Sequence, residues 1–334
     1  MSRAQLTSTV EQNTGGAVAP FVAGKNKIIN GDFGIWQRGT SFSTVNTYTA
    51  DRWRSNFDGT GATRTVSQQT FTPGTAPVVG YEGQFFFRFN KSVGGSGGTI
   101  DYVIQQLIED CRVLAGQTVT LSFWAKSDAS RTVNAYIQQN LGTGGLGSPA
   151  GQGYSSFSLT TSWQRFTMTV TLPSLAGMTI GTSSFLTASL YWSNTNLTGI
   201  IDIWGVQLEA GSVATPFTTA TGTLQGELAA CQRYCWVMGI NVDWPGQYYS
   251  TSTVYGSVKF PSTMRAVPSL TVSTAGAINV FAGGSGRTST AITSDALSTD
   301  TGGFGITTSA TGTTGWGTSN RINSGATATW SAEL

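Results

Sequence analysis

The feature that most constrains this chain is the alternation of apolar and polar side chains along several short runs. In the run 118–126 every second residue is apolar, and the runs 132–138, 165–172 and 185–192 alternate in the same way. Because successive side chains of a β-strand point to opposite faces, a period of two predicts strands of antiparallel sheets. Many such strands at regular spacing favour a sandwich or jelly roll, so we expect an all-β protein.

The composition favours a folded β protein over a disordered chain. Gly is frequent, with 43 of 334 residues, and only 10% of the residues are charged. The chain also contains 10 Trp, 17 Phe and 10 Tyr, whereas disordered segments are poor in aromatic residues. Aromatic residues interleaved with Thr and Val suit a pleated sheet, with Gly in the turns.

Residue types and charge exclude several classes of function. The chain has no His, which excludes Ser-His-Asp and Cys-His catalysis and the HExxH type of zinc site. The net charge is only +2, whereas proteins that bind nucleic acid carry clustered Lys and Arg against the phosphates, so we expect no binding of nucleic acid. The sequence has no run of 18 apolar residues, so we expect no membrane insertion, and its start lacks the apolar core of a secretory signal.

The three cysteines do not form the even, dense set of a disulfide framework. We expect Cys111, Cys231 and Cys235 to be buried, reduced thiols, since a free Cys behaves as a small apolar residue. This usage fits synthesis in a reducing cytoplasm.

Changes in composition and periodicity along the sequence divide the chain into four parts. Residues 1–24 are small and polar without a sustained period, and we expect an extended arm there. Strand-like runs separated by turns predict a jelly-roll β-sandwich over 25–215. A linker with a short helix follows at 216–235, and a second, distal β-sandwich domain is expected at 236–334.

The linker holds the one segment with a helical period. Leu224, Leu228, Cys231 and Cys235 are spaced by 4, 3 and 4 residues, which gives a narrow apolar stripe on a helix of about three turns. So short a helix must pack on something. It either packs on a sheet or meets its own copies around a symmetry axis, and self-association would also help a distal domain that is poor in Leu and Ile.

Several motifs resemble the jelly-roll modules of bacteriophage tail and virion proteins. They are KNKIINGDF (25–33), LAGQTVTLSFWAK (114–126), IDIWGVQLEAG (201–211) and ELAACQRY (227–234). The resemblance implies a structural or host-recognition protein of the phage particle, made in the host cytoplasm and commonly trimeric. The arm at 1–24 would then bind other virion proteins, and the distal domain would contact the host surface.

The same module resembles carbohydrate-binding jelly rolls, which open with an NGDFE-like turn and close with an Asp-containing last strand. Those two ends can share a structural Ca²⁺. Here Gly34 stands in the place of the Glu, which leaves Asp32 and Asp202 as possible oxygen ligands. The alternative is that both carboxylates cap turns. No other cofactor is implied.

Aromatic residues on the polar faces of the strands are the candidates for sugar binding. Trp124, Tyr136 and Tyr191 are out of register with the apolar faces of their strands, and Asn134 and Gln138 accompany them. Such rings stack on the apolar faces of pyranoses while amides hold the hydroxyls. The alternative is a second buried layer, beneath a loop or another subunit.

A second aromatic cluster lies in the distal domain, around the sequence PGQYY. Trp244, Tyr248, Tyr249 and Tyr255 would form a surface for host glycans, because exposed Tyr and Trp are favoured at recognition surfaces. Packing between subunits is the alternative.

Three functions fit these patterns. The leading interpretation is a non-enzymatic tail fibre protein that contacts host surface glycans. A head decoration or head fibre protein is the second, and a polysaccharide-degrading tailspike is the third. Glycoside hydrolysis needs two facing carboxylates, whereas Glu109 and Asp110 are adjacent and would point to opposite faces of a strand.

Overall fold

The structure is a computed structural model of the 334-residue chain. It describes residues 23–44, 46–57, 60–78, 81–96, 101–147, 149, 153–192, 197–240, 242–295 and 298–334. Of the arm expected at 1–24, all but Ala23 and Gly24 lies outside the described residues.

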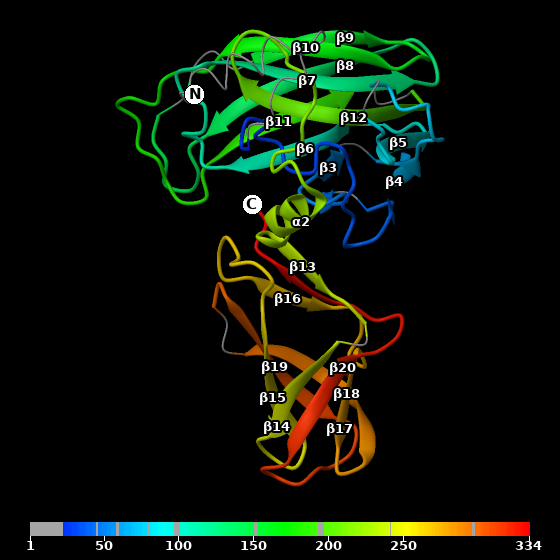
Figure 1. Ribbon diagram of the computed structural model, residues 1–334, viewed down its shortest axis with the longest axis vertical. Coiled ribbons are helices and arrows are strands. Elements are labelled where there is room, and N and C mark those ends of the chain that lie inside the picture. Colours follow the sequence, from blue (N-terminus) through cyan, green and yellow to red (C-terminus); the bar gives the residue numbers. More distant parts are fainter. Residues whose placement is uncertain are drawn as a thin grey trace, which may run out of the picture.

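Two six-stranded antiparallel sheets face each other and form the expected jelly-roll sandwich (Figure 1). The β12 sheet has the order β1 (Ser41–Phe42), β4 (Thr63–Thr70), β5 (Phe85–Val93), β12 (Gly199–Ala210), β7 (Thr118–Ser127) and β10 (Gln164–Thr171). The β8 sheet has the order β2 (Thr47–Tyr48), β3 (Arg54–Phe57), β6 (Asp101–Glu109), β11 (Phe185–Trp192), β8 (Arg131–Asn140) and β9 (Gly153–Leu159). The four alternating runs of the sequence are β7, β8, β10 and β11, so their prediction is confirmed.

The inward faces of the two sheets make one apolar core. Val119, Leu121 and Phe123 of β7 are at most 1% exposed there, as the alternation predicts. The other face of β7 is buried too, because aromatic side chains of neighbouring strands and of loops pack there in a second layer. This second layer consists of Phe71, Phe86, Trp124, Trp204 and Phe217.

The expected helix is present as α2 (Leu224–Gln232), which begins at the N-cap Thr223. The Thr223 side chain accepts a hydrogen bond from the Gly226 amide, at 3.0 Å, and so satisfies one of the free donors of the first turn. After α2, a three-stranded sheet has the order β13 (Cys235–Met238), β21 (Ala328–Ser331) and β16 (Ser269–Val272).

The remaining C-terminal strands close into a barrel, where the sequence led us to expect a sandwich. Its order is β14 (Asp243–Tyr248), β15 (Thr253–Lys259), β19 (Thr301–Thr308), β18 (Ser285–Asp295), β17 (Ile278–Ala282) and β20 (Gly317–Ile322). Closure removes exposed sheet edges. The barrel shares an apolar core with the three-stranded sheet, because Phe304 packs against Trp244 of β14 and against Trp330 of β21, with ring centroids 5.2 Å apart in each pair. The jelly roll and the barrel lie at opposite ends of the molecule, with α2 between them (Figure 1).

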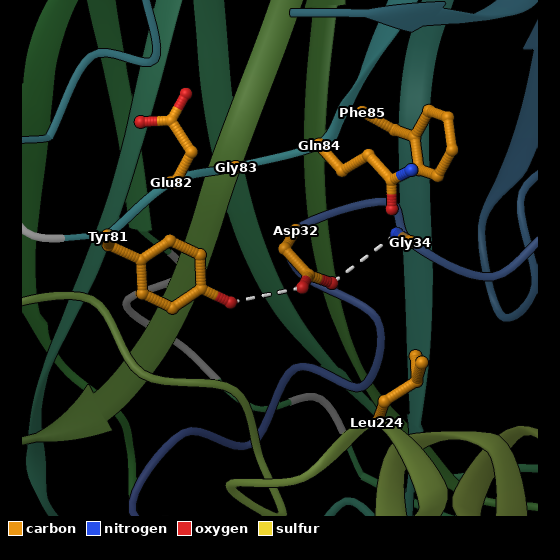
Figure 2. A pocket seen from close by; sticks show the side chains of 8 residues that line it. All are labelled: Asp32, Gly34, Tyr81, Glu82, Gly83, Gln84, Phe85 and Leu224. Carbon is orange, nitrogen blue, oxygen red and sulfur yellow. Dashed lines mark hydrogen bonds between the residues drawn. The ribbon is translucent and has the colours of Figure 1, made fainter. Parts of the chain in front are cut away.

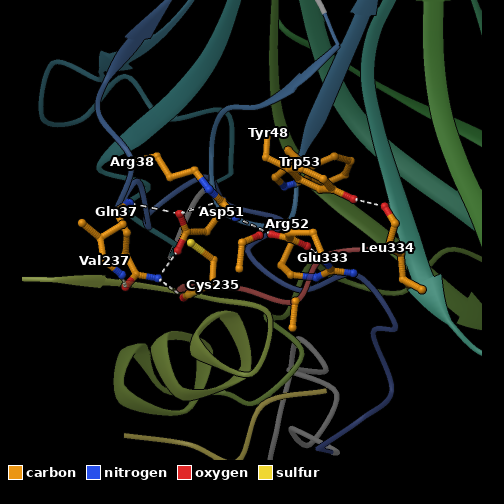
Figure 3. Close-up of polar contacts among 12 residues, drawn as sticks. Gln37, Arg38, Tyr48, Asp51, Arg52, Trp53, Cys235, Val237, Glu333 and Leu334 are labelled. Carbon is orange, nitrogen blue, oxygen red and sulfur yellow. Dashed lines mark hydrogen bonds and ion pairs between the residues drawn. The ribbon is translucent and has the colours of Figure 1, made fainter. Parts of the chain in front are cut away.

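The end of the chain returns from the barrel to the jelly roll. Glu333 forms ion pairs with Arg52 and with Arg38, the latter at 2.8 Å, and the Tyr48 hydroxyl donates to the Leu334 carbonyl at 2.8 Å (Figure 3). Both Arg52 and Glu333 are nearly fully buried. The C-terminus therefore ties the two domains together and does not lie at the distal tip of the barrel.

Asp51 belongs to the same junction. Its carboxylate accepts a hydrogen bond from the Gln37 amide at 3.0 Å and lies 3.8 Å from the Arg38 guanidinium. Burial raises the pKa of Asp51 to about 6, although Arg38 and Gln37 act in the opposite direction. The junction is thus a buried polar region whose charge state depends on pH near neutrality.

Candidate functional site

The outer face of the β8 sheet gathers tyrosines and uncharged polar side chains, and we call this set the tyrosine face. The strand pairing brings it together from three strands: on β8, Tyr136 lies opposite Tyr154 of β9, and Asn134 lies opposite Tyr191 of β11. Tyr154 is 57% exposed, whereas Tyr136 and Tyr191 are half-buried. The members of the tyrosine face are Tyr136, Tyr154, Tyr191, Asn134, Gln138 and Ser156.

Asn134 is the centre of the hydrogen bonds on this face. Its Oδ1 atom accepts from the Tyr154 hydroxyl at 2.9 Å and from the Ser156 hydroxyl at 2.7 Å. Hydrogen bonds with Ser156 and Tyr191 lower the pKa of the Tyr154 hydroxyl from its ordinary value. The rings of Tyr154 and Tyr191 lie 6.1 Å apart, so the network holds two rings side by side on the sheet.

Four of the five residues predicted for a sugar site therefore lie on one face, and the fifth does not. Trp124 is on β7, on the outer face of the other sheet, and is only 9% exposed. The Arg165 guanidinium lies 4.6 Å from its ring centroid, and the Trp204 ring packs against it at 5.5 Å. The prediction of an exposed Trp124 is wrong, because the second buried layer that was its alternative covers the residue.

Tyr154 and Ser156 were missed at the sequence level, although a signal for them exists. In the run 153–159, Tyr154 and Ser156 alternate with Phe157 and Leu159, and Leu159 is fully buried in the core. The period of two therefore places Tyr154 on the outer face. What the sequence lacks is the pairing of β8 with β9, which brings Tyr154 next to Tyr136.

The aromatic cluster predicted in the distal domain divides in the same way between the inside and the outside of a sheet. Trp244 and Tyr248 point into the barrel and are 4% and 1% exposed, so they cannot contact a ligand as predicted. Tyr249 and Tyr255 are 72% and 40% exposed.

The apolar stripe predicted on α2 is not the face with which the helix packs. Leu224 and Leu228 are exposed, whereas Cys231 is buried in the helix and Cys235 is buried in β13. The buried face carries Glu227 instead, whose carboxylate accepts hydrogen bonds from the amides of Asn30 and Thr221, both at 2.7 Å. A buried carboxylate that caps two backbone amides replaces the expected apolar contact.

The two carboxylates considered for Ca²⁺ do not fit a calcium site. Asp202 forms a two-pronged ion pair with Arg88, at 2.7 and 2.8 Å, and lies 3.8 Å from Lys126. Its oxygens are therefore taken by cationic side chains, whereas Ca²⁺ needs six to eight oxygen ligands. Within the described ranges, no group of three or more His, Cys, Asp or Glu side chains is placed to hold a metal ion.

Asp32 instead lines a pocket of about 510 Å³ between the jelly roll and α2 (Figure 2). The Tyr81 hydroxyl donates to its carboxylate at 3.1 Å, and the Gly34 amide donates at 3.4 Å. Burial raises the pKa of the Asp32 carboxyl, although both hydrogen bonds act in the opposite direction. The Gly34 contact is the local one that a turn cap makes, whereas the Tyr81 contact joins segments 49 residues apart in the sequence.

The adjacent carboxylates Glu109 and Asp110 contact different partners. Glu109 forms an ion pair with Arg233 at 3.0 Å and accepts from the Tyr234 hydroxyl at 2.8 Å. Asp110 pairs with Arg112 at 2.9 Å. Glu109 thus helps to join the jelly roll to the end of α2.

Of the helices in the described part of the chain, none is long and apolar enough to cross a membrane.

Residues 59–182 match the family model described as carbohydrate binding domain. This match includes β8 and β9, and hence five of the six members of the tyrosine face, but not Tyr191 of β11. No curated protein matches the chain.

Solved structures with a similar fold include carbohydrate-binding modules and a phage protein. A family 4 carbohydrate-binding module is 21% identical, with a TM-score of 0.33, over 55% of this chain and 98% of the module. A family 11 module from Clostridium thermocellum, in complex with a β-1,3-1,4-mixed-linked tetrasaccharide, is 14% identical, with a TM-score of 0.33, over 53% of this chain and 98% of the module. The enzymatically active domain of tailspike protein 4 from bacteriophage CBA120 is 15% identical, with a TM-score of 0.37, over 56% of this chain and 22% of that one.

Proposed function

We propose that the jelly roll binds carbohydrate on the tyrosine face. The observation that carries the proposal is the set of three tyrosines arranged around Asn134 on one outer sheet face. The match of residues 59–182 to the carbohydrate binding domain family supports it. Exposed rings next to amides form the kind of surface that holds a ligand with both apolar and hydroxyl-bearing faces.

The chemistry of the face determines how a sugar would be held. The rings of Tyr136 and Tyr154 offer apolar surface to the C–H face of a pyranose, and the Gln138 amide offers both a donor and an acceptor to its hydroxyls. None of the members of the tyrosine face is charged. Binding should therefore depend weakly on salt, because screening acts on charge–charge interactions.

Binding of oligosaccharides to the full chain and to Tyr154→Ala tests the proposal. The probes are neutral tetrasaccharides of glucose, galactose, mannose and N-acetylglucosamine, and calorimetric titration measures their affinity. Removal of an exposed ring at the centre of a recognition surface should weaken binding by about tenfold or more. Tyr154→Phe keeps the ring and should retain most of the affinity.

Leu146→Ala is the matched control, because Leu146 is 68% exposed on the same domain outside the tyrosine face. This variant should bind as the wild type does. Equal affinities of the wild type and Tyr154→Ala for every sugar that binds would refute the assignment of the site.

We also propose that the chain is a non-enzymatic protein of the phage virion, of tail fibre type, which uses this site on host surface glycans. The phage-like motifs at 25–33, 114–126 and 201–211 support this role. A head decoration or head fibre protein is the alternative, and imaging of labelled particles separates head from tail. Release of oligosaccharides from purified host capsule or lipopolysaccharide would instead indicate a polysaccharide-degrading tailspike.

A homotrimer is part of this proposal, with residues 1–24 bound to other virion proteins. Leu224 and Leu228 are 71% and 36% exposed on α2, and burial of such side chains against other copies would stabilise a trimer. Light scattering after size exclusion measures the mass. A monomer at micromolar concentration would contradict the trimer, and Leu224→Glu with Leu228→Glu should dissociate it.

A further inference from the structure

A groove of about 430 Å³ lies on the outside of the barrel. The barrel itself is at the end of the molecule far from the jelly roll (Figure 1). Four neighbouring strands, β14, β15, β19 and β18, contribute its walls and floor. The lining residues that matter here are Pro245, Gln247, Tyr255, Ser257, Asp295 and Gly303.

The floor of this groove is the backbone of β19, because the outward positions of this strand are glycines and carry no side chain. Phe304 and Ile306 are fully buried in the barrel core, so the alternation of the strand places Gly303 and Gly305 on the outer face. Gly303 lies opposite both Ser257 and Asp295. Glycine weakens a strand interior, and its use there often marks a place where another group approaches the backbone closely.

Gly305 has a second role, because it allows the Tyr255 ring to lie beside the strand. A Cβ atom at this position would lie 3.3 Å from Cε1 of Tyr255 and 2.7 Å from Oγ1 of Thr293. The strand pairing confirms the arrangement, since Gly305 lies opposite Tyr255 on one side and Thr293 on the other. The ring therefore forms one side of the groove.

A second tyrosine braces this ring. The rings of Tyr249 and Tyr255 are 5.3 Å apart at an angle of 66°, which is a favourable edge-to-face arrangement. They remain 72% and 40% exposed. Two exposed rings thus lie beside a groove in which the side chains of Gln247, Ser257 and Asp295 can form hydrogen bonds.

We propose that this groove is a second carbohydrate subsite, which takes a neutral pyranose unit of a glycan. The sugar ring packs against Tyr255, the Gln247 amide and the Ser257 hydroxyl bond its hydroxyls, and the Asp295 carboxylate accepts from them. Since Asp295 is the charged group among the lining residues, anionic sugars are repelled and neutral ones are favoured.

The subsite is independent of the tyrosine face, so either can exist without the other. If both are present, one chain can engage a glycan surface at two points near opposite ends of its length. Such linkage raises overall avidity without new contacts, because the second contact becomes intramolecular.

The test uses the full chain, the four neutral tetrasaccharides named above, and tetragalacturonate as the anionic probe. Titrations compare the wild type with Tyr255→Ala and with a variant blocked at the tyrosine face, Tyr136→Ala/Tyr154→Ala. Phe281→Ala is the matched control, because Phe281 is 38% exposed on β17, outside the groove. Gln247→Ala and Asp295→Asn provide second variants if Tyr255→Ala does not fold.

The blocked variant should still bind at least one neutral tetrasaccharide, and adding Tyr255→Ala to it should weaken that binding by about tenfold or more. Phe281→Ala should leave it unchanged, and tetragalacturonate should not bind at the groove. The subsite is refuted if the blocked variant binds no neutral probe, or if Tyr255→Ala has no larger effect than Phe281→Ala. If Tyr255→Ala abolishes all binding and the blocked variant matches the wild type, the function proposed for the tyrosine face fails while the groove remains.

Discussion

The jelly roll and the barrel place their charged side chains differently. In the jelly roll, Asp101 forms ion pairs with Lys91 at 2.8 Å and with Arg64 at 2.7 Å, and the three side chains are at most 4% exposed. In the barrel, Arg321 pairs with Asp243 at 2.6 Å, but these side chains are 41% and 45% exposed.

The difference shows two ways in which a chain poor in charge can specify a β fold. The jelly roll buries two cationic side chains together with one carboxylate. The ion pairs between them compensate the free-energy cost of removing each charge from water. The barrel relies on closure and on a small aromatic core around Phe304 and Trp330. Loss of a single charge should therefore affect the two domains very differently.

The largest effect is expected from Asp101→Ala. The substitution leaves Lys91 and Arg64 buried without their carboxylate, and loss of one partner of a buried ion pair costs about 3–5 kcal/mol. Urea denaturation, followed by the fluorescence of the jelly-roll tryptophans, measures the change in the free energy of unfolding. A decrease in the free energy of unfolding of less than about 1 kcal/mol would contradict this, because it would show that water solvates Lys91 and Arg64 as it does the charges of a surface ion pair.

The next effect concerns the junction between the domains and its dependence on pH. The pKa of Asp51 is about 6 in the folded protein and 3.8 ordinarily, so the folded state holds this proton more tightly than the unfolded state. Lowering the pH from 7 to 4 should then stabilise the folded state through Asp51 by about 2 kcal/mol.

Asp51→Asn isolates this contribution, because the variant has no proton to bind there. The difference in unfolding free energy between the wild type and Asp51→Asn should change with pH between 7 and 4, in favour of the wild type at the lower pH. Parallel curves over this range would contradict a raised pKa at Asp51.

The smallest effect is expected from Asp243→Ala in the barrel. An exposed ion pair contributes little to stability, because water solvates both charges and salt screens them. Thermal unfolding of the barrel should therefore shift little, and the shift should vanish at high salt. A cost as large as that of Asp101→Ala would remove the contrast between the two domains.

Local pattern was sufficient to predict the four alternating strands and the presence of the helix, although not the face with which the helix packs. The runs 118–126 and 185–192 became β7 and β11, and the segment with helical spacing became α2. These elements follow from side-chain periodicity, which the sequence displays directly.

The prediction of the site failed where segments distant in the sequence bury an outward-facing side chain. Trp124 and Tyr136 occupy equivalent outward positions on their strands, yet Phe71 and Phe217 belong to the buried layer over Trp124, while Tyr136 is half-buried. Trp244 likewise points into the barrel from β14, whereas Tyr249 follows the end of that strand and is exposed. Such cover depends on contacts between segments far apart in the sequence, and periodicity does not report it.

The most direct test of the central claim is a crystal structure of the full chain with the tetrasaccharide that it binds most tightly. The account predicts a pyranose ring in contact with Tyr136, Tyr154 or Tyr191, with carbon atoms within about 4.5 Å of a tyrosine ring. It also predicts a hydrogen bond from a sugar hydroxyl to Gln138 or Asn134. A jelly roll whose bound sugar lies elsewhere, with the tyrosine face empty, would contradict the account.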